Sequence, residues 1–158
     1  MKTIYLGADH AGFELKEKVK QWLKKKRIPF QDLGNVKYDQ DDDYPDYAEK
    51  VGRQVVRAKS KGILFCGSAE GICIAANKMK GVRAVAVWDT RMAEQSRRHN
   101  DANVLCLSGG GTLTMVPGLG LPFDTAQKII NVWLTTPFSN AARHQRRIQK
   151  IKKLELRV

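Results

Sequence analysis

The sequence predicts a single α/β domain built around a parallel sheet, and two observations carry that prediction. Short apolar runs of strand length alternate along the chain with amphipathic segments of helical length, the pattern of consecutive βαβ units. The chain has 158 residues, enough for one sizeable core, and shows no internal repeat or linker. We therefore expect one domain over residues 1–158.

The first half of the chain supplies two strands and two helices. Residues 2–8 form an apolar run, and Leu15, Val19, Trp22 and Leu23 then recur at the spacing of one helix face. Residues 28–33 predict the second strand. Residues 34–44 are acidic and loop-like, and Pro45 suits the first turn of a helix that extends to about Lys59.

The second half repeats the alternation and then changes character. Strands are predicted over 63–66, 82–88 and 104–107, and helices over 72–79, 90–98, 123–134 and 140–154. The turn between the strand at 63–66 and the next helix covers 67–71. Residues 108–122 are rich in glycine and proline, which predicts a loop or an insertion.

Composition limits the classes of protein to which the chain could belong. No apolar stretch approaches the 18 residues of a membrane span, and the N-terminus lacks the layout of a signal peptide, so we expect a cytoplasmic protein. Three cysteines without close spacing argue against disulfides and zinc. The net charge of +12 favours an anionic partner, although basic clusters at 24–27 and 143–157 also suit solvated helix ends.

Ligands of open parallel sheets bind at the carboxyl ends of strands, and three segments follow from that rule. They are Asp9-His10, the turn from Cys66 to Gly71, and His99-Asn100 just before the last strand. A small-residue turn before a helix points backbone N–H groups into a cup that suits a phosphate or an oxyanion. A thiol beside that helix start is expected to have a pKa below about 8.5, although a buried structural thiol fits Cys66 equally well.

Other side chains are compatible with a site or with an ordinary structural role. Histidines suit acid–base chemistry near neutral pH, which makes His10 and His99 candidates. Arg143 and Arg147 share one face of the last helix, where two guanidinium forks suit a phosphate but where a solvated basic stripe is the simpler reading. Cys73 and Cys106 are expected in the core.

Six blocks of the sequence together resemble the ribose-5-phosphate isomerase B family, which includes the galactose-6-phosphate isomerase subunits. The blocks are Gly7-Ala8-Asp9-His10-Ala11-Gly12-Phe13, Asp43-Tyr44-Pro45, Cys66-Gly67-Ser68, Ala75-Ala76-Asn77-Lys78, Arg97-Arg98-His99-Asn100-Asp101 and Arg143-His144-Gln145-Arg146-Arg147. They occur in order over about residues 2–152. The resemblance implies a Rossmann-like three-layer αβα sandwich with a five-stranded parallel sheet.

The resemblance also implies an activity, partners and roles. The family interconverts aldose and ketose phosphates through a cis-enediolate without metal or nucleotide, as dimers or tetramers with active sites at a subunit interface to which helix 140–154 contributes. Cys66 would be the base, and His99 would open the sugar ring. Ligand contacts would come from the donors Ser68 and the amides of Gly67, Ala69, Glu70 and Gly71, from Asp9 and Asn100 on hydroxyls, and from His10, Arg143 and Arg147 on phosphate.

Three departures from the family pattern leave other functions open. Ala69 replaces a usual glycine, Ser108-Gly109-Gly110-Gly111 replaces a Gly-x-Arg whose arginine contacts phosphate, and residues 112–122 resemble an insertion of about nine residues. An isomerase for ribose 5-phosphate is the leading prediction. A tetrose or hexose phosphate isomerase, or a phosphosugar-binding module that has lost its chemistry, is the alternative. Nucleic-acid binding ranks last, because no DNA or RNA motif accompanies the positive charge.

Overall fold

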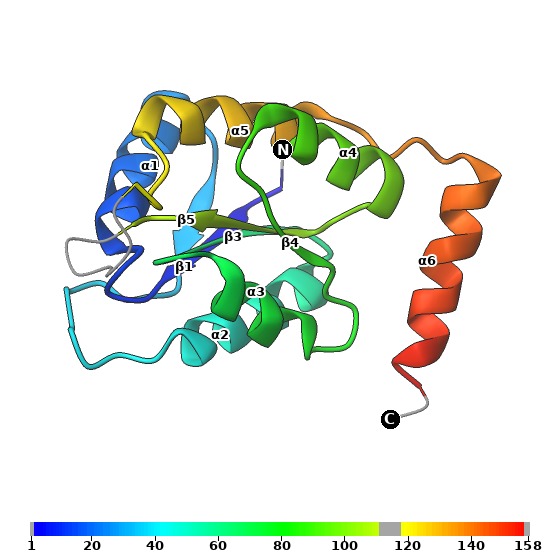
Figure 1. Ribbon diagram of the computed structural model, residues 1–158, viewed down its shortest axis with the longest axis horizontal. Coiled ribbons are helices and arrows are strands. Elements are labelled where there is room, and N and C mark those ends of the chain that lie inside the picture. The colour runs from blue at the N-terminus through cyan, green and yellow to red at the C-terminus, as the bar shows by residue number, and fades with distance from the viewer. Residues whose placement is uncertain (1, 111–117, 157–158) are drawn as a thin grey trace.

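The computed structural model describes residues 2–110 and 118–156, and it contains the predicted parallel sheet at the centre of the molecule (Figure 1). Five strands pair in parallel in the order β2-β1-β3-β5-β4. Their bounds are β1 Ile4–Ala8, β2 Phe30–Asp32, β3 Lys61–Cys66, β4 Ala84–Ala86 and β5 Val104–Ser108. The predicted α/β fold with five parallel strands is confirmed.

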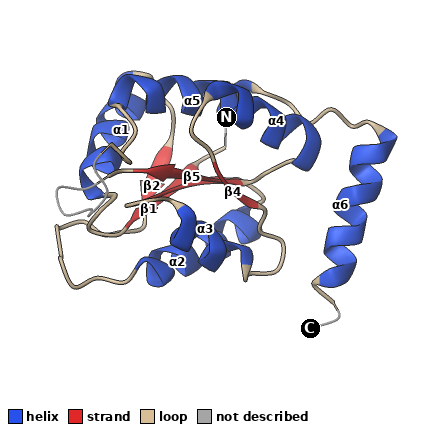
Figure 2. Cartoon of the chain, in the orientation of Figure 1, coloured by secondary structure: helices blue, strands red, loops and turns tan. Residues whose placement is uncertain are grey.

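Helices cover both faces of the sheet and complete the three layers (Figure 2). One face carries α1 Phe13–Lys25, α4 Thr90–Asn100 and α5 Phe123–Thr135, and the other carries α2 Tyr44–Ala58 and α3 Glu70–Asn77. Each face encloses its own apolar core. Trp133 and Phe65 are fully buried in the larger core, and Leu64 and Ile72 are fully buried in the smaller one. Because both faces are covered, the central strands read as continuous apolar runs.

Two helix boundaries differ from the prediction in ways that affect candidate residues. Helix α3 begins at Glu70, so Glu70 and Gly71 form its first turn and do not belong to the preceding loop. Helix α4 continues to Asn100, so His99 and Asn100 are helical. The capping residues Ala69 and Asp101 both adopt left-handed backbone angles, with φ of 67° and 45°, and these turns set the two ends.

Helix α6, Ala142–Leu154, stands beside the sandwich and is not one of its layers (Figure 1). Its first turn is held at the end of α4, and at its other end Glu155 Oε1 accepts a hydrogen bond from Gly81 N at 3.1 Å. Leu154 and Leu156 nevertheless leave 59% and 67% of their surface exposed. Within the described residues, no helix has the length and apolar character that a membrane crossing requires.

The loop that follows β1 lies so close to the end of strand β3 that only glycine fits at one position. A Cβ atom on Gly12 would lie 2.3 Å from the backbone carbonyl carbon of Phe65. Backbone atoms cannot swing aside as a side chain can, so a methyl group here must push the loop away from the strand.

We expect Gly12→Ala to destabilise the protein by about 1–3 kcal/mol, because overpacking forces the backbone to shift. Thermal unfolding measures the effect. Gly52→Ala is the matched control, since its new methyl would meet side-chain atoms and no backbone, namely the flexible end of Met79 and, at 3.3 Å, Val82 Cγ2, while helix α2 gains from alanine. Equal stability of the two variants would contradict the tight packing of the Gly12 loop against β3.

Candidate active site

A buried thiol and a buried carboxyl group meet where β1 and β3 end. The strands are neighbours in register, with Ala8 opposite Phe65, so the next residues of the two strands, Asp9 and Cys66, lie side by side. Cys66 Sγ donates to Asp9 Oδ2 at 2.9 Å, and Asp9 Oδ1 accepts from Gly12 N at 2.9 Å. Asp9 is 4% exposed and Cys66 8%. This pair is the chemical centre of the carboxyl edge of the sheet.

The expected activation of the thiol is wrong, because its surroundings favour the protonated form. Burial raises the pKa of Cys66 to about 12, and the hydrogen bond and negative charge of Asp9 add to the increase. The backbone N–H groups of Gly67 and Ile72 lower that pKa, as the helix-start argument predicted, but they are outweighed. Burial likewise raises the pKa of Asp9 above its usual value. The two groups are therefore best described together.

The turn after β3 consists of small residues and lies beside the Asp9–Cys66 pair. Ser68 is partly exposed, and its Oγ accepts a hydrogen bond from Glu70 N at 3.3 Å. Ala69 has the positive φ that glycine usually supplies, so the concern about this substitution is borne out in the backbone. Its methyl group is 1% exposed and packs in the smaller core. Glu70 is exposed at the start of α3.

The segment after β5 binds the cup from the side and holds its backbone in place. Gly109 N donates to Cys66 O at 2.8 Å, and Gly110 N donates to Gly67 O at 3.2 Å. Ser108 is fully buried and its hydroxyl bonds to the carbonyls of Gly67 and Leu119. Ser108 thus has a structural role where the family usually continues to an arginine. Residue 111 and residues 112–117 of the suspected insertion lie outside the described residues.

His10 is held at this edge by a chain of hydrogen bonds that sequence reasoning missed. Asp42 Oδ1 lies 2.8 Å from both the backbone N and the ring Nδ1 of His10. Asn35 Nδ2 donates to Asp42 Oδ2 at 2.7 Å, and the buried Lys16 Nζ donates to Asn35 O at 2.8 Å. With Asp42 on Nδ1, the other ring nitrogen of His10 is left for a ligand. Only the acidic character of 34–44 marked this segment in the sequence.

His99 and Asn100 lie at the opposite edge of the sheet, which corrects the expectation of one shared cleft. Ligands of parallel sheets bind beside residues that follow strands, whereas His99 and Asn100 end α4 and precede β5. In the β3–β5 register, Cys66 pairs with Ser108 while Gly62 pairs with Val104. Four residues of strand separate the two edges by about 13 Å. One chain therefore does not bring His99 to Cys66.

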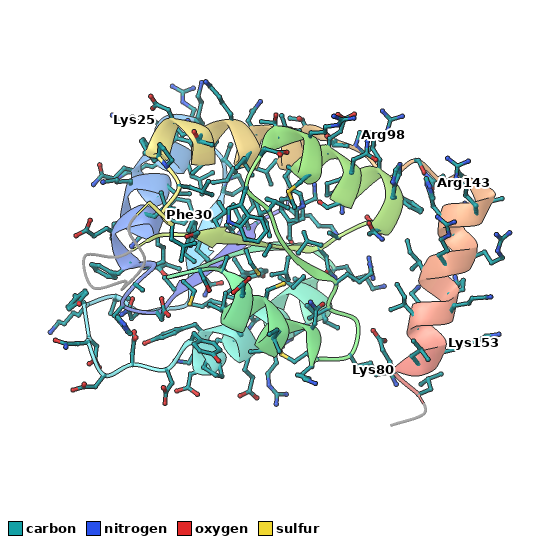
Figure 3. The ribbon with its side chains drawn as sticks, in the orientation of Figure 1. Lys25, Phe30, Lys80, Arg98, Arg143 and Lys153 are labelled. Carbon is teal, nitrogen blue, oxygen red and sulfur yellow. The ribbon has the colours of Figure 1, made fainter. Side chains whose placement is uncertain are left out.

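A second cluster of candidate residues forms around His99 at that edge. The rings of His99 and His144 lie 4.3 Å apart, and Arg143 Nε donates to His144 Nε2 at 3.2 Å. Burial lowers the pKa of His144, and the charges of His99, Arg143 and Arg147 lower it further. Figure 3 shows Arg98 on α4 and Arg143 at the start of α6, on the side where the two helices approach each other. The cluster gathers positive charge suited to phosphate, and His144 is a member that the sequence analysis did not assign.

The other two thiols lie in or against the smaller core and are not part of the Asp9–Cys66 pair. Cys106 is fully buried and Cys73 packs against the smaller core, as predicted. Among the described residues, no group of three or more His, Cys, Asp or Glu side chains is arranged to hold a metal ion.

Comparison with known proteins places this geometry in a family. The family model named Ribose/Galactose Isomerase matches residues 4–151. The probable ribose-5-phosphate isomerase B of Mycoplasma pneumoniae is 40% identical over 94% of this chain and 91% of its own length. The ribose-5-phosphate isomerase B of Mycobacterium tuberculosis is 39% identical over 96% of this chain and 89% of its own.

Solved structures agree with the sequence relatives. The ribose-5-phosphate isomerase B of Mycoplasma genitalium, with bound ribulose-5-phosphate, superposes with a TM-score of 0.88 at 38% identity and covers 99% of this chain and 97% of its own. The enzyme of Clostridium thermocellum gives 0.88 at 36% identity, with 99% of both chains covered. The match extends over almost the whole length in each case. The chain belongs to the ribose/galactose isomerase family.

Proposed function

We propose that this chain interconverts ribose 5-phosphate and ribulose 5-phosphate through a cis-enediolate, without a metal or nucleotide cofactor. The observation that carries the proposal is the hydrogen-bonded Asp9–Cys66 pair beside a cup of backbone amides. Two observations on relatives support the choice of substrate. The relative from Mycobacterium tuberculosis is named ribose-5-phosphate isomerase B, and the structure of the relative from Mycoplasma genitalium contains bound ribulose-5-phosphate. A base in hydrogen-bond contact with a second acid–base group is what proton transfer between adjacent carbons requires.

Cys66 and Asp9 act in this proposal as a unit that carries one proton. The thiol passes its proton to the Asp9 carboxylate while its sulfur takes the C2 proton of the aldose, which leaves an enediolate. The sulfur then delivers that proton to C1. Asp9 gives its proton to the oxygen on C1 and takes the proton of the hydroxyl on C2, which becomes the ketone. Asp9 finally returns this proton to the sulfur, which restores the starting pair. The Ser68 hydroxyl and the amides of the cup hold the negative oxygen, where one donor contributes about 3–4 kcal/mol in the transition state.

A second copy of the chain completes the site in this proposal. The phosphate-binding arginines Arg143 and Arg147 lie with His99 and Asn100 at the amino edge, away from the Asp9–Cys66 pair. A two-fold dimer can place the amino edge of one chain against the carboxyl edge of the other, twice. Helix α6 and the residues just after it, with the exposed Leu154 and Leu156, would contribute to that interface.

Within the shared site, each edge would contribute distinct functions. His10 would bind phosphate together with the partner's arginines, and His99 would open the sugar ring while Asn100 and Asp9 bind hydroxyls. A base that must stay a reduced thiol suits a reducing compartment, so a cytoplasmic location is part of the proposal.

A coupled activity screen tests the substrate. We expect turnover of ribose 5-phosphate to exceed that of tetrose and hexose phosphates, with kcat/KM in the range of ordinary enzymes, roughly 10⁴ M⁻¹s⁻¹ or more. Glu70 places a carboxylate beside the turn and Ala69 departs from the glycine of the family pattern, so a higher kcat/KM for a tetrose or hexose phosphate would assign that alternative substrate. Tight binding of pentose phosphates with no turnover of any sugar would contradict an isomerase.

Asp9→Asn tests the proton-carrying pair. The amide removes the negative charge that, together with burial, raises the pKa of the thiol, so we expect that pKa to fall and kcat to decrease about 100-fold or more. The rate of thiol alkylation against pH measures the pKa, in a Cys73→Ser background so that the half-buried second thiol does not react. An unchanged alkylation profile would show that Asp9 does not act on Cys66.

Mixing two inactive variants tests whether the site is shared. A Cys66→Ala and a His99→Gln chain, refolded together in equal amounts, should recover about a quarter of wild-type activity, because half of the dimers then contain one intact site of two. Cys66→Ala mixed with Ser68→Ala is the matched control and should recover nothing, since both defects lie at the same edge. Recovery in neither mixture would mean that each chain uses its own His99.

A further inference from the structure

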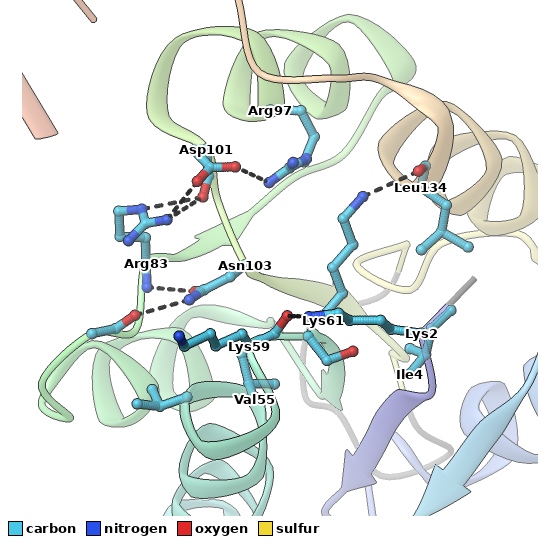
Figure 4. Close-up of a pocket in the computed structure, with 13 residues that line it drawn as sticks. Lys2, Ile4, Val55, Lys59, Lys61, Arg83, Arg97, Asp101, Asn103 and Leu134 are labelled. Atoms are coloured by element: carbon cyan, nitrogen blue, oxygen red, sulfur yellow. Dashed lines mark hydrogen bonds and ion pairs between the residues drawn. The ribbon is translucent and has the colours of Figure 1, made fainter. Parts of the chain in front are cut away.

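A cavity of about 470 Å³ lies at the amino edge of the sheet, away from the Asp9–Cys66 pair (Figure 4). Its walls are the starts of β1 and β3, the end of α2, the segment before β4, and the segment that joins α4 to β5. Ligand sites in proteins commonly have volumes of roughly 300–1,000 Å³, so the cavity has room for a small metabolite. None of the roles assigned above uses it.

Positive charge dominates the lining of this cavity. One acidic side chain, Asp101, faces five basic ones, which gives a formal charge of +4; the basic residues are Lys2, Lys59, Lys61, Arg83 and Arg97. They come from four separate parts of the chain that the fold brings together. A concave surface with one sign of charge concentrates counter-ions of the other sign.

Asp101 forms its ion pairs with the two arginines, and its charge acts on Lys61 more weakly than burial and Arg97 do. Its Oδ2 accepts from Arg83 Nη2 at 2.9 Å and its Oδ1 lies 2.8 Å from Arg97 Nη1, as Figure 4 shows. Among the residues that the structure describes, neither Lys59 nor Lys61 forms an ion pair. The charge of both lysines is therefore left for an external anion.

Lys61 is the most informative of these side chains, because it is partly buried with only backbone acceptors. Its Nζ lies 3.1 Å from Leu134 O and 3.4 Å from Trp133 O, and 5.1 Å from the centre of the Trp133 ring. Burial lowers its pKa to about 8, and the neighbouring Arg97 adds to the decrease. An anion in the cavity would raise the pKa of Lys61 again, because a nearby negative charge favours the protonated lysine.

We propose that this cavity is a second anion site that binds a small phosphorylated metabolite, with Lys59 and Lys61 as its principal contacts. Phosphate groups match the chemistry, since lysine ammonium groups bind them as point charges and the fixed arginines add to the field. The site shares the segment 97–101 with His99 and Asn100, so an occupant would lie directly behind the residues proposed to act on the sugar.

Calorimetric titration of the intact protein with pyrophosphate tests the proposal. We expect Lys61→Met to weaken binding to this site at least tenfold, while the KM for ribose 5-phosphate stays unchanged. Lys18→Met is the matched control, because Lys18 is an exposed lysine on α1 far from the cavity lining, and it should bind as the wild type does.

Two further measurements separate lost binding at this cavity from lost folding and from binding at the isomerase site. Lys61→Met should unfold at a temperature equal to or higher than that of the wild type without ligand, because it removes a partly buried charge, so lost binding is not lost folding. His10→Asn, which alters the isomerase site, should retain the Lys61-dependent binding. Wild-type affinity in Lys61→Met, or loss of all pyrophosphate binding in His10→Asn, would overturn the proposal.

Discussion

The contact between the Cys66 thiol and the Asp9 carboxylate is the interaction on which the site depends. Both groups are almost fully buried, and each changes the proton affinity of the other. Close contacts between backbone atoms hold the two groups together. Gly12 allows the loop after β1 to lie against β3, and Gly109 allows the segment after β5 to lie against the loop after β1. Gly109 N also donates a hydrogen bond to Cys66 O. A buried polar pair of this kind keeps a single arrangement only while the surrounding backbone holds both residues in place.

The length of the strands has an equally direct consequence for function. A parallel sheet places all its strand ends at one edge and all its starts at the other. Chemistry based on Asp9 and Cys66 is thus separated from the basic cluster around His144 by the full extent of β3 and β5. The proposed dimer would unite these two groups of residues by bringing a second chain to each edge. The exposed Leu154 at the end of α6 is consistent with that proposal.

Much of this was predictable from the sequence, and the failures have identifiable causes. Alternating periodicity predicted all five strands and all six helices because their patterns are local. The pKa of Cys66 was predicted in the wrong direction because burial, the largest cause of its increase, arises only in the folded chain, and because contact with Asp9, 57 residues away, follows only from the β1–β3 register. His99 was placed at the wrong edge because being near a strand in sequence does not say at which end. Asp42 and His144 were missed because their roles arise from contacts with His10 and His99 alone.

In the proposed mechanism, the Cys66 thiol and the Asp9 carboxylate share one proton and transfer it between them. The most direct test is the rate at which solvent deuterium enters C2 of ribose 5-phosphate, measured as kcat/KM from about pH 7.5 to about 9.5. Because the pKa of Cys66 is raised to about 12, the thiol keeps its proton across this range, so the rate should be constant. A rate that rises about tenfold with each pH unit would show that a free thiolate is the base and would contradict the paired mechanism.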